Sequence, residues 1–370
     1  MIAARNQPGS PLIGIIGCEG KWGKELGAFF KKKGCKVIGS DIGTRLANRQ
    51  IVERTDVVIF SILPVSEAMR VMEAMGKFSR PEQLWLDVTS VKTEPCKAML
   101  KSKADVAGLH PMFPPLKGNW ERQSLIICPV RLSGRWQEWL DGAFSGQGLR
   151  VFREKPELHD SITAITQGIA HDLCVIGAIV MRKSGFDLAT LIAHGGPVFK
   201  LLTGVIARVL GQNPEMYAGI QLHNEFVKSH LFWLSEEMKK AYEAVESGDK
   251  AELLRIFREA GRFFEDNLAA SAALFEELRQ MEMNRLNPHM LVLETEGGYG
   301  DQAGLLYDIA AVFKEHKVNL VSYVTKKIGE KQYRFEIATE KPLEFREVGE
   351  SIRALEKLKG VKLLFHKTIA

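Results

Sequence analysis

Two short segments of this chain carry side chains suited to moving a proton. The segment AGLHPMFPP at 107–115 places His110 directly after an apolar run and before prolines that cannot all belong to one regular element. The segment DVTSVK at 87–92 places the hydroxyl of Ser90 at the end of another apolar run. An imidazole with an unperturbed pKa of about 6.5 accepts protons readily near neutral pH. We therefore predict that His110 is a general base and that Ser90 lies beside it.

Each of these two residues also has a structural explanation. A serine at that point can cap a helix, and a histidine among prolines can stabilise a turn by hydrogen bonding. Their joint position favours the chemical interpretation, because ligands of an open α/β sheet bind beyond the carboxyl ends of its strands. Both side chains are then expected to border the same bound ligand.

A glycine-rich turn near the N-terminus indicates what that ligand is. The sequence IIGCEGKWGKELG places Gly17, Gly20 and Gly23 in a G-x-x-G-x-x-G spacing after the first apolar run. Such a turn lets the backbone approach a pyrophosphate, which the N–H groups of the following helix bind. Asp41 closes the second apolar run and can accept hydrogen bonds from ribose hydroxyls, which favours NAD, although Arg45 keeps NADP open. A hydride acceptor beside a hydroxyl and an imidazole suits the oxidation of a hydroxyl-bearing carbon.

The elements that position these residues follow an α/β pattern. Short apolar runs alternate with helical patterns, and they cover 11–17, 35–41, 56–63, 84–90, 105–110 and 124–130. Continuous rather than alternating apolarity predicts strands that are buried on both faces of a parallel sheet. We therefore expect residues 1–155 to form a doubly wound, Rossmann-like domain that binds NAD.

Long segments with a helical period dominate the next part of the chain. They cover 159–183, 218–247 and 250–281, so residues 156–285 are predicted to form an all-helical domain. Several of these helices are apolar around much of their circumference, which suggests burial against one another or against a second subunit.

This helical domain supplies further candidate side chains. His171 lies in an apolar helix, where a core histidine is more common than a ligand contact. Arg208 is surrounded by apolar residues in the sequence, and a buried guanidinium would find its partner in a substrate carboxylate. Lys200 and Lys92 are weaker candidates, because a lysine ammonium usually reaches water. The neighbouring pair His159 and Asp160 also belongs to this domain.

The last part of the chain begins after the break at Asn287 and Pro288. It has the predicted order strand, helix, strand, strand, helix, strand, over 289–295, 304–316, 318–325, 332–339, 344–357 and 360–366. Residues 286–370 are therefore predicted to form a ferredoxin-like βαββαβ domain.

Composition excludes several classes of protein. The net charge is +5, from 50 basic and 45 acidic residues that are scattered along the chain, which argues against a nucleic-acid partner. The five cysteines are an odd number without a CxxC pair, and most lie in apolar runs, which indicates free thiols in a reducing cytoplasm and no metal site. We expect neither a signal peptide nor a transmembrane helix.

Several of these motifs, taken in order, resemble the prephenate dehydrogenase family of tyrosine biosynthesis. The glycine turn, DVTSVK, GLHPMF, TQGIAH and ARVLGQNPEMYAGI carry the resemblance over residues 12 to about 282. The glycine spacing resembles that of members which are archaeal or fused to other aromatic-pathway domains. The resemblance implies a cytoplasmic homodimer that oxidises prephenate with NAD and releases carbon dioxide and 4-hydroxyphenylpyruvate, with residues 156–285 as its substrate and dimerisation domain.

The resemblance also implies roles for the candidate residues. His110 would hydrogen-bond the ring hydroxyl of prephenate and accept its proton while the same carbon gives up hydride. Ser90 would orient that histidine or the hydroxyl. His171 would line the substrate pocket, and Arg208 would hold a substrate carboxylate.

Two residues depart from the family pattern. Pro114 stands where the family commonly has glycine, and it stiffens the loop beside the base. Lys200, a candidate for substrate binding, stands where fused members tend to carry arginine, whose planar fork a lysine does not reproduce.

The βαββαβ region resembles an ACT domain, through GGYGDQAGLL at 297–306 and VNLVSYV at 318–324. This resemblance implies that such domains pair through their sheet edges and bind amino acids, so tyrosine or phenylalanine would be an effector held near Gly300, Asp301 and Gly304. The alternative is that this domain serves only to form dimers.

Other functions stay open at this point. Arogenate dehydrogenase, or an enzyme for an amino-substituted prephenate, differs from prephenate dehydrogenase in a few pocket residues that one sequence does not identify. A regulator that senses an amino acid on a non-catalytic dehydrogenase scaffold is a further alternative. The presence of both Ser90 and His110 argues against this last alternative.

Overall fold

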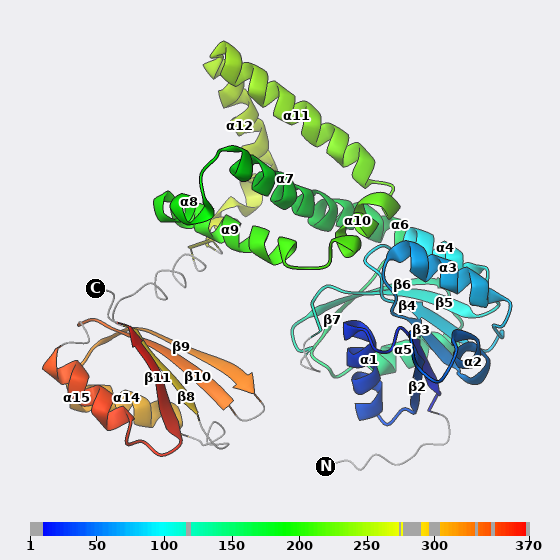
Figure 1. Cartoon of the computed structure of the whole chain (residues 1–370), viewed down its shortest axis with the longest axis horizontal. Coiled ribbons are helices and arrows are strands. Elements are labelled where there is room, and N and C mark those ends of the chain that lie inside the picture. The colour runs from blue at the N-terminus through cyan, green and yellow to red at the C-terminus, as the bar shows by residue number, and fades with distance from the viewer. Residues whose placement is uncertain are drawn as a thin grey trace. The chain divides into compact units, whose positions relative to one another are not determined.

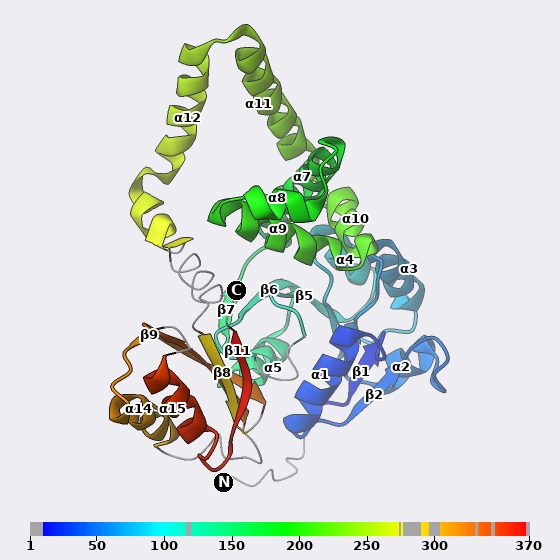
Figure 2. The same ribbon diagram turned by 60° about the vertical axis from the view of Figure 1, so that its left-hand side comes forward.

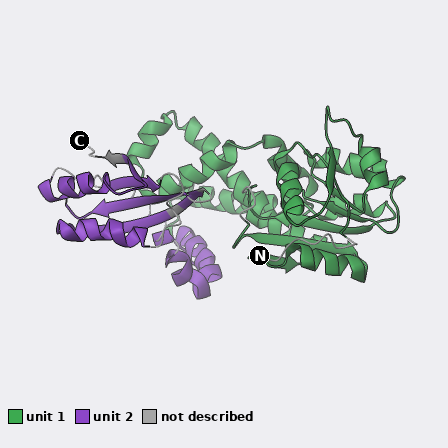
Figure 3. Ribbon diagram, turned by 90° about the horizontal axis from the view of Figure 1, so that it is seen from below, with its two compact units in different colours: residues 1–250 green, residues 251–370 purple. Residues whose placement is uncertain are grey.

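The computed structural model describes residues 10–115, 120–273, 275–276, 290–295, 304–329, 332–341 and 345–367. Gly300 and Asp301, which the sequence marks as effector contacts, lie outside these ranges, whereas Gly304 lies inside them. The chain divides into two compact units, residues 1–250 and residues 251–370 (Figure 3). The first unit contains a large sheet and the helices that follow it, and the second contains a small sheet.

One seven-stranded sheet organises the first unit. Its strands are β1 (Ile13–Ile16), β2 (Val37–Ser40), β3 (Val57–Phe60), β4 (Leu84–Asp87), β5 (Asp105–Pro111), β6 (Ser124–Arg131) and β7 (Arg150–Arg153). They lie in the order β2-β1-β3-β4-β5-β6-β7, so the strand order reverses between β1 and β3. In such sheets the crevice at the reversal point binds ligands beyond the carboxyl ends of the strands.

The prediction of a parallel sheet holds for β1 to β5 and is wrong for β6. Strands β1 to β5 pair in parallel, whereas β6 pairs antiparallel with β5, and β7 is parallel to β6. The segment from Leu125 to Cys128 is nonetheless buried, because both faces of the sheet are covered at this strand. Continuous apolarity therefore reports burial on two faces and does not report strand direction.

Helices cover both faces of this sheet, as a doubly wound fold requires (Figure 1). Helices α1 (Lys21–Lys32) and α5 (Gly134–Phe144) pack on one face, and α2 (Asn48–Arg54), α3 (Val65–Gly76) and α4 (Thr93–Leu100) pack on the other. Successive strand residues point to opposite faces, so Ile15 lies in the first core with Phe30, and Ile16 lies in the second with Trp85. The predicted architecture of the nucleotide-binding region is confirmed.

A run of helices follows the sheet. It comprises α6 (Pro156–Thr163), the π-helix η1 (Ala164–Ile169), α7 (Ala170–Lys183), α8 (Leu188–His194), α9 (Pro197–Leu210), α10 (Pro214–His223) and α11 (Val227–Ser247). Helices α7 to α10 gather at one end of the sheet (Figure 2). The predicted helical segment 218–247 is divided at Asn224, which is buried and whose side chain donates to the carbonyl of Asp160. Oδ1 of Asn224 also accepts from the backbone N–H of Phe226, two residues further on, and such local bonds compete with helix continuation.

These helices expose many apolar side chains in the single chain. Ile179, Val198 and Val205 are among them, whereas only Ile206 and Val209 are buried in α9. The continuous helical stretch Pro156–Lys183 is long and apolar enough to cross a membrane. An 18-residue window within it has a mean hydropathy of 1.6, and 17% of that window is buried. This result rests on length and composition alone, so the absence of a transmembrane helix stays a prediction. The stretch also carries the buried polar residues His159 and Asp160, which bond to neighbouring elements.

The second unit contains the predicted ferredoxin-like order. It begins with α12 (Lys250–Phe264) and the 3-10 turn η2 (Glu265–Asn267), and continues with β8 (Met290–Thr295), α14 (Leu305–Glu315), β9 (Leu320–Gly329), β10 (Gln332–Thr339), α15 (Arg346–Leu355) and β11 (Val361–Lys367). The four strands form an antiparallel sheet in the order β11-β8-β10-β9. Ile309, Phe313 and Val348 from the two helices pack on Leu293 and Ile337 of the sheet. The βαββαβ prediction is confirmed.

Candidate active site

The turn between β1 and α1 depends on two of its three glycines. Gly17 has a φ of +89°, and a Cβ there would lie 2.1 Å from the carbonyl oxygen of Ser61. A Cβ on Gly23 would lie 2.1 Å from the carbonyl oxygen of Gly17. Gly20 is exposed and precedes α1, whose N-terminus has no side-chain cap and no acidic residue in its first turn. The backbone therefore presents helix N–H groups that suit an anion such as a pyrophosphate.

Asp41 lies beside this turn, as the sequence predicts. Its Oδ2 accepts a hydrogen bond of 2.8 Å from the backbone N–H of Glu19, and its Oδ1 accepts one of 2.7 Å from Ile42. Each carboxylate oxygen has a second lone pair, and the side chain is only half-buried, so Asp41 keeps acceptors for ribose hydroxyls. The same carboxylate thus holds the turn and faces the space beside it.

His110 lies at the carboxyl end of β5, buried, and its partner is a second histidine. Its Nδ1 lies 2.8 Å from Nε2 of His159, and Nδ1 of His159 lies 2.8 Å from Oδ1 of Asp160. An ionised carboxylate only accepts, so His159 donates from Nδ1, and a singly protonated His159 then accepts at Nε2. His110 must then donate from Nδ1, which leaves the lone pair on its Nε2. The arrangement fixes His110 as a neutral imidazole with a free basic nitrogen.

Asp160 is held by the N-terminus of α4. The backbone N–H groups of Lys92 and Thr93 donate to its Oδ1 and Oδ2, each at 2.8 Å. Burial acts to raise the pKa of Asp160, but the hydrogen bonds from His159, Thr93 and Lys92 outweigh it and hold the pKa below its ordinary value. Asp160 therefore stays ionised and acceptor-only, as the proton positions on the two histidines require.

Lys92, whose backbone N–H binds Asp160, also forms a buried ion pair through its side chain with Asp87. Lys92, fully buried, places Nζ 2.5 Å from Oδ2 of Asp87 and 2.9 Å from the carbonyl oxygen of Leu109. The expectation that this ammonium reaches water is wrong, because a buried carboxylate and a carbonyl replace the water. Gly108 makes the arrangement feasible, since a Cβ there would lie 2.6 Å from Cδ of Lys92. The lysine thus ties the loop after β4 to the residue that precedes His110.

These surroundings determine the protonation of His110. Burial lowers its pKa well below 6.5, and the neighbouring His159 and the Lys92 ammonium lower it further. The imidazole is therefore neutral near pH 7, which is the state that a general base needs before it accepts a proton.

Ser90 occupies the loop between β4 and α4 and is half-buried. Within the described ranges it makes no hydrogen bond to His110, and the N-cap position of α4 belongs to Lys92 rather than to Ser90. The side chain that does reach Nε2 of His110 is Gln167, whose Nε2 lies 3.4 Å away. The sequence segment TQGIAH contains Gln167 but gave no reason to single it out.

A second group of site candidates lies on α7, α9 and α10. The ring of His171 packs edge-on against Tyr217 with centroids 4.5 Å apart, and its Nδ1 is buried without a partner. Burial and the nearby Arg208 guanidinium lower the pKa of His171. Arg208 itself is exposed in the last turn of α9, so the expectation of a buried guanidinium is wrong for the single chain. Lys200 lies earlier on α9 and is half-buried.

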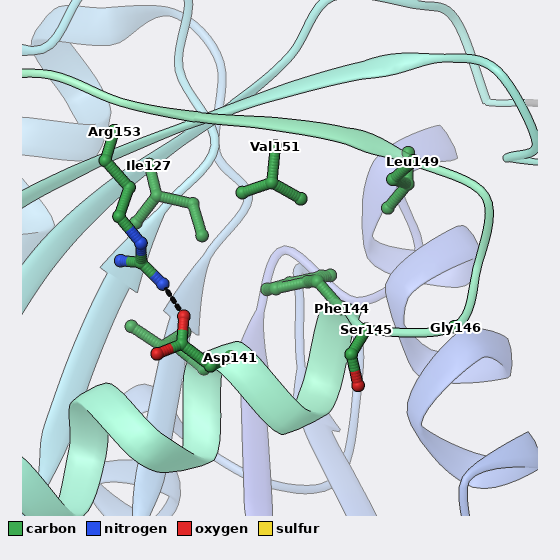
Figure 4. A pocket seen from close by; sticks show the side chains of 9 residues that line it. Ile127, Asp141, Phe144, Ser145, Gly146, Leu149, Val151 and Arg153 are labelled. Carbon is green, nitrogen blue, oxygen red and sulfur yellow. Dashed lines mark hydrogen bonds and ion pairs between the residues drawn. The ribbon is translucent and has the colours of Figure 1, made fainter.

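A separate pocket lies between α5 and the edge of the sheet (Figure 4). Ile127, Phe144 and Val151 line it, and Arg153 forms an ion pair with Asp141 at its rim. None of the predicted site residues lines this pocket. Across the described ranges no cluster of His, Cys, Asp or Glu side chains could hold a metal ion, and all five cysteines are free thiols.

Comparisons with known proteins place this geometry in a family. Residues 29–151 match the nucleotide-binding domain of prephenate dehydrogenase, and residues 155–259 match its dimerisation domain. The glycine turn precedes the first matched residue, so its assignment rests on the geometry described above. The match to the dimerisation domain includes the helices whose apolar side chains are exposed in the single chain.

Individual relatives agree with these family matches. The chain is 29% identical over 272 residues to the probable arogenate/prephenate dehydrogenase of Methanocaldococcus jannaschii, across 68% of this chain and 60% of that protein. It is 26% identical over 206 residues to the 4-amino-4-deoxyprephenate dehydrogenase of Streptomyces pristinaespiralis, across 55% of this chain and 69% of that protein.

A solved structure has the same fold. It is the crystal structure of prephenate dehydrogenase from A. aeolicus in complex with hydroxyphenyl propionate and NAD+. The TM-score is 0.54 at 19% sequence identity, and the alignment covers 71% of this chain and 99% of that one. Because two consecutive family domains match and their fold is present, this chain belongs to the prephenate dehydrogenase family.

Proposed function

We propose that this chain is an NAD-dependent dehydrogenase that oxidatively decarboxylates prephenate, with arogenate as the alternative substrate. The observation that carries the proposal is the chain of contacts from Asp160 through His159 to His110. It leaves one basic nitrogen, Nε2 of His110, at the carboxyl end of β5, where ligands of such sheets bind.

The chemistry requires only a small set of transfers. Nε2 of His110 takes the proton of the ring hydroxyl while the C–H bond on the same carbon breaks and its electron pair leaves as hydride. The bond between the ring and its carboxylate then breaks, carbon dioxide departs, and the electron pair makes the ring aromatic. The phenolate oxygen takes the proton back from His110, so no net proton is released. Aromatisation drives the sequence, and the protein supplies position and charge.

The residues of the glycine turn fit the cofactor. NAD, when bound, supplies the hydride acceptor. Gly17 and Gly23 let the backbone turn tightly, the uncapped N-terminus of α1 would hold the pyrophosphate, and Asp41 would accept from the ribose hydroxyls. A 2′-phosphate would be repelled by the Asp41 carboxylate, so we propose a preference for NAD over NADP.

The substrate carboxylates need cationic partners. We assign Arg208 to one of them, since its exposed guanidinium lies near His171 and can form two parallel hydrogen bonds. His171 contributes a wall of the substrate site, and Lys200 a second positive charge. Ser90 orients either the bound hydroxyl or His110, because it lies in the loop that Lys92 fixes.

The exposed apolar side chains of the helices suggest how two copies of the chain assemble. We propose a homodimer that buries the apolar side chains of α7 and α9, which the family assigns to dimerisation. The same pairing accounts for the apolar stretch Pro156–Lys183 without a membrane. Five free thiols agree with a cytoplasmic enzyme.

Residues 286–370, within the second unit, are proposed to act as an ACT-like effector domain. Gly304 has a φ of +94° and is the residue before α14, a backbone conformation that favours glycine at the start of this helix. A helix start suits the carboxylate of an amino acid, and tyrosine or phenylalanine is the proposed effector. Roles for Gly300 and Asp301 belong to the same proposal.

Initial rates with prephenate and with arogenate, each with NAD and NADP, test the assignment. We expect turnover of prephenate with NAD, and a higher kcat/KM for arogenate would reassign the substrate. Absence of turnover with both substrates would favour the alternative of a non-catalytic regulator that senses an amino acid.

A further inference from the structure

We propose that Gln167 selects a hydroxyl group, rather than an amino group, on the substrate carbon that is oxidised. This inference rests on the proposed function, because it concerns the group that donates its proton to His110. The sequence gave Gln167 no role, and its importance follows from where the π-helix η1 places its side chain.

Gln167 approaches the basic face of His110. Its Nε2 lies 3.4 Å from Nε2 of His110 and 4.0 Å from Sδ of Met112, and its Oε1 is buried without a hydrogen-bond partner. Because Nε2 of His110 carries a lone pair, the amide must present N–H rather than oxygen to it. The contact is long for a hydrogen bond, so an oxygen atom that fits better can replace it.

The backbone of η1 is held on two sides, so this amide has a defined position. Nε2 of Gln221 on α10 donates to the carbonyl oxygen of Gly168 at 3.0 Å. Gly168 also lies close to α11, since a Cβ there would lie 2.7 Å from Cγ2 of Val227. Single-turn π-helical irregularities often mark functional positions, and this one places Gln167 beside the base.

A hydroxyl satisfies both groups at once. It donates its single hydrogen to Nε2 of His110 and accepts from Nε2 of Gln167 through an oxygen lone pair. An ammonium group on the same carbon has three N–H donors and no lone pair, so in the amide orientation of this structure it would face the Gln167 N–H without forming a bond. Gln167 is half-buried, and a donor that a bound ligand covers without pairing lowers affinity by a factor of about 10 to 100. Gln167 therefore discriminates by the number of lone pairs rather than by size.

Replacement by glutamate reverses the polarity of this contact at almost constant shape. In Gln167→Glu a carboxylate accepts from an ammonium group and no longer donates to a hydroxyl oxygen. Gln167→Leu removes both functions and keeps the approximate volume. Thr166→Val serves as the matched control, because Thr166 lies in the same π-helix and its exposed hydroxyl donates only to the carbonyl of Ile162.

The experiment measures kcat/KM for prephenate and for 4-amino-4-deoxyprephenate in the full-length wild type and in the three variants. We expect the ratio of kcat/KM for prephenate to kcat/KM for 4-amino-4-deoxyprephenate to fall at least about tenfold in Gln167→Glu. The same ratio should stay within about twofold of the wild type in Thr166→Val. In Gln167→Leu we expect kcat/KM for prephenate to fall about tenfold, with the NAD dissociation constant and Tm close to those of the wild type.

Two results separate the failure of this inference from the failure of the proposed function. If the wild type turns over prephenate and the ratio is unchanged in Gln167→Glu, Gln167 does not select the substituent. If Gln167→Glu does not fold, an unchanged prephenate kcat/KM in Gln167→Leu overturns the inference equally. A wild type that oxidises neither prephenate nor arogenate refutes the proposed function, and this inference falls with it.

Discussion

His110 and His159 are joined by a contact of 2.8 Å between Nδ1 and Nε2, although they lie 49 positions apart in the chain. His110 belongs to the last positions of β5, and His159 belongs to α6, the first helix after the sheet. The tautomer of the base is therefore set by an element outside the nucleotide-binding sheet. The active site exists only when α6 is docked on the sheet, which links the folding of the two regions to the chemistry.

Replacement of the base should slow the chemical step without weakening cofactor binding. We expect His110→Asn to lower kcat by two to four orders of magnitude, about the range for loss of a general base. The NAD dissociation constant should change little, because the glycine turn and Asp41 are not altered. Steady-state kinetics and NAD titration by fluorescence measure the two effects, and turnover near that of the wild type would exclude His110 as the base.

Replacement of Asp160 should disturb the base from a distance. In Asp160→Asn one carboxylate oxygen becomes an NH2 group, which must face an N–H donor of Lys92, Thr93 or His159. We expect kcat to fall about tenfold or more and the free energy of unfolding to fall by about 1–3 kcal/mol. Denaturant unfolding and kinetics measure the two losses. Full activity would show that the His159 tautomer does not depend on Asp160.

The acid limb of the pH profile should reflect the lowered pKa of His110. Burial lowers that pKa below 6.5, so the imidazole stays basic in mildly acidic solution. We expect the acid limb of kcat/KM to have an apparent pKa below about 6.5. A limb with an apparent pKa clearly above that value would show that another group limits the rate.

Stability should change over the same pH range. In the folded state His110 and His171 both have lowered pKa values, so below about pH 6.5 the unfolded chain binds protons that the folded chain does not. The free energy of unfolding is therefore highest above about pH 6.5. It decreases as the pH falls toward the lowered pKa values of the two histidines. We expect Tm to decrease from pH 7 to pH 5 and to decrease less steeply in His110→Asn. An equal slope in both proteins would contradict the burial of a neutral imidazole.

Much of this arrangement follows from the sequence, and the remainder depends on tertiary contacts. The glycine turn, the strand ends and the position of His110 follow from local rules, since each rests on chain geometry within a few residues. The roles of His159 and Lys92 do not, because a buried histidine and a buried lysine acquire meaning only from partners far along the chain. Gln167 was missed because no local pattern marks a π-helix.

Removal of Arg208 should affect substrate binding before turnover. We expect Arg208→Ala to raise KM for the substrate by at least tenfold with a smaller change in kcat, about the loss of one charge-assisted hydrogen-bonded pair. Arg208→Lys should recover part of the loss, because it keeps the charge but not the planar fork. Initial-rate kinetics decide, and an unchanged KM in Arg208→Ala would assign the residue to structure.

An amino acid effector should be detectable on the full-length chain. If the second unit binds tyrosine, millimolar tyrosine should raise Tm or change the rate, because a ligand that binds only the folded state stabilises it. Phenylalanine serves as the comparison that tests the phenolic hydroxyl, and alanine serves as the negative control. If none of these amino acids alters Tm or rate, dimer formation is the better interpretation of this unit.

Gly108, which has no side chain, leaves room in β5 for the side chain of Lys92 from the loop before α4. Lys92 passes through the space that a methyl group would fill, and its ammonium ends on the carbonyl that precedes the base. A single added carbon at this position would displace the cation, leave the Asp87 carboxylate without its counter-charge and shift the end of β5. Any larger residue at position 108 would therefore require the Lys92 side chain to move, although position 108 lies two residues before the base.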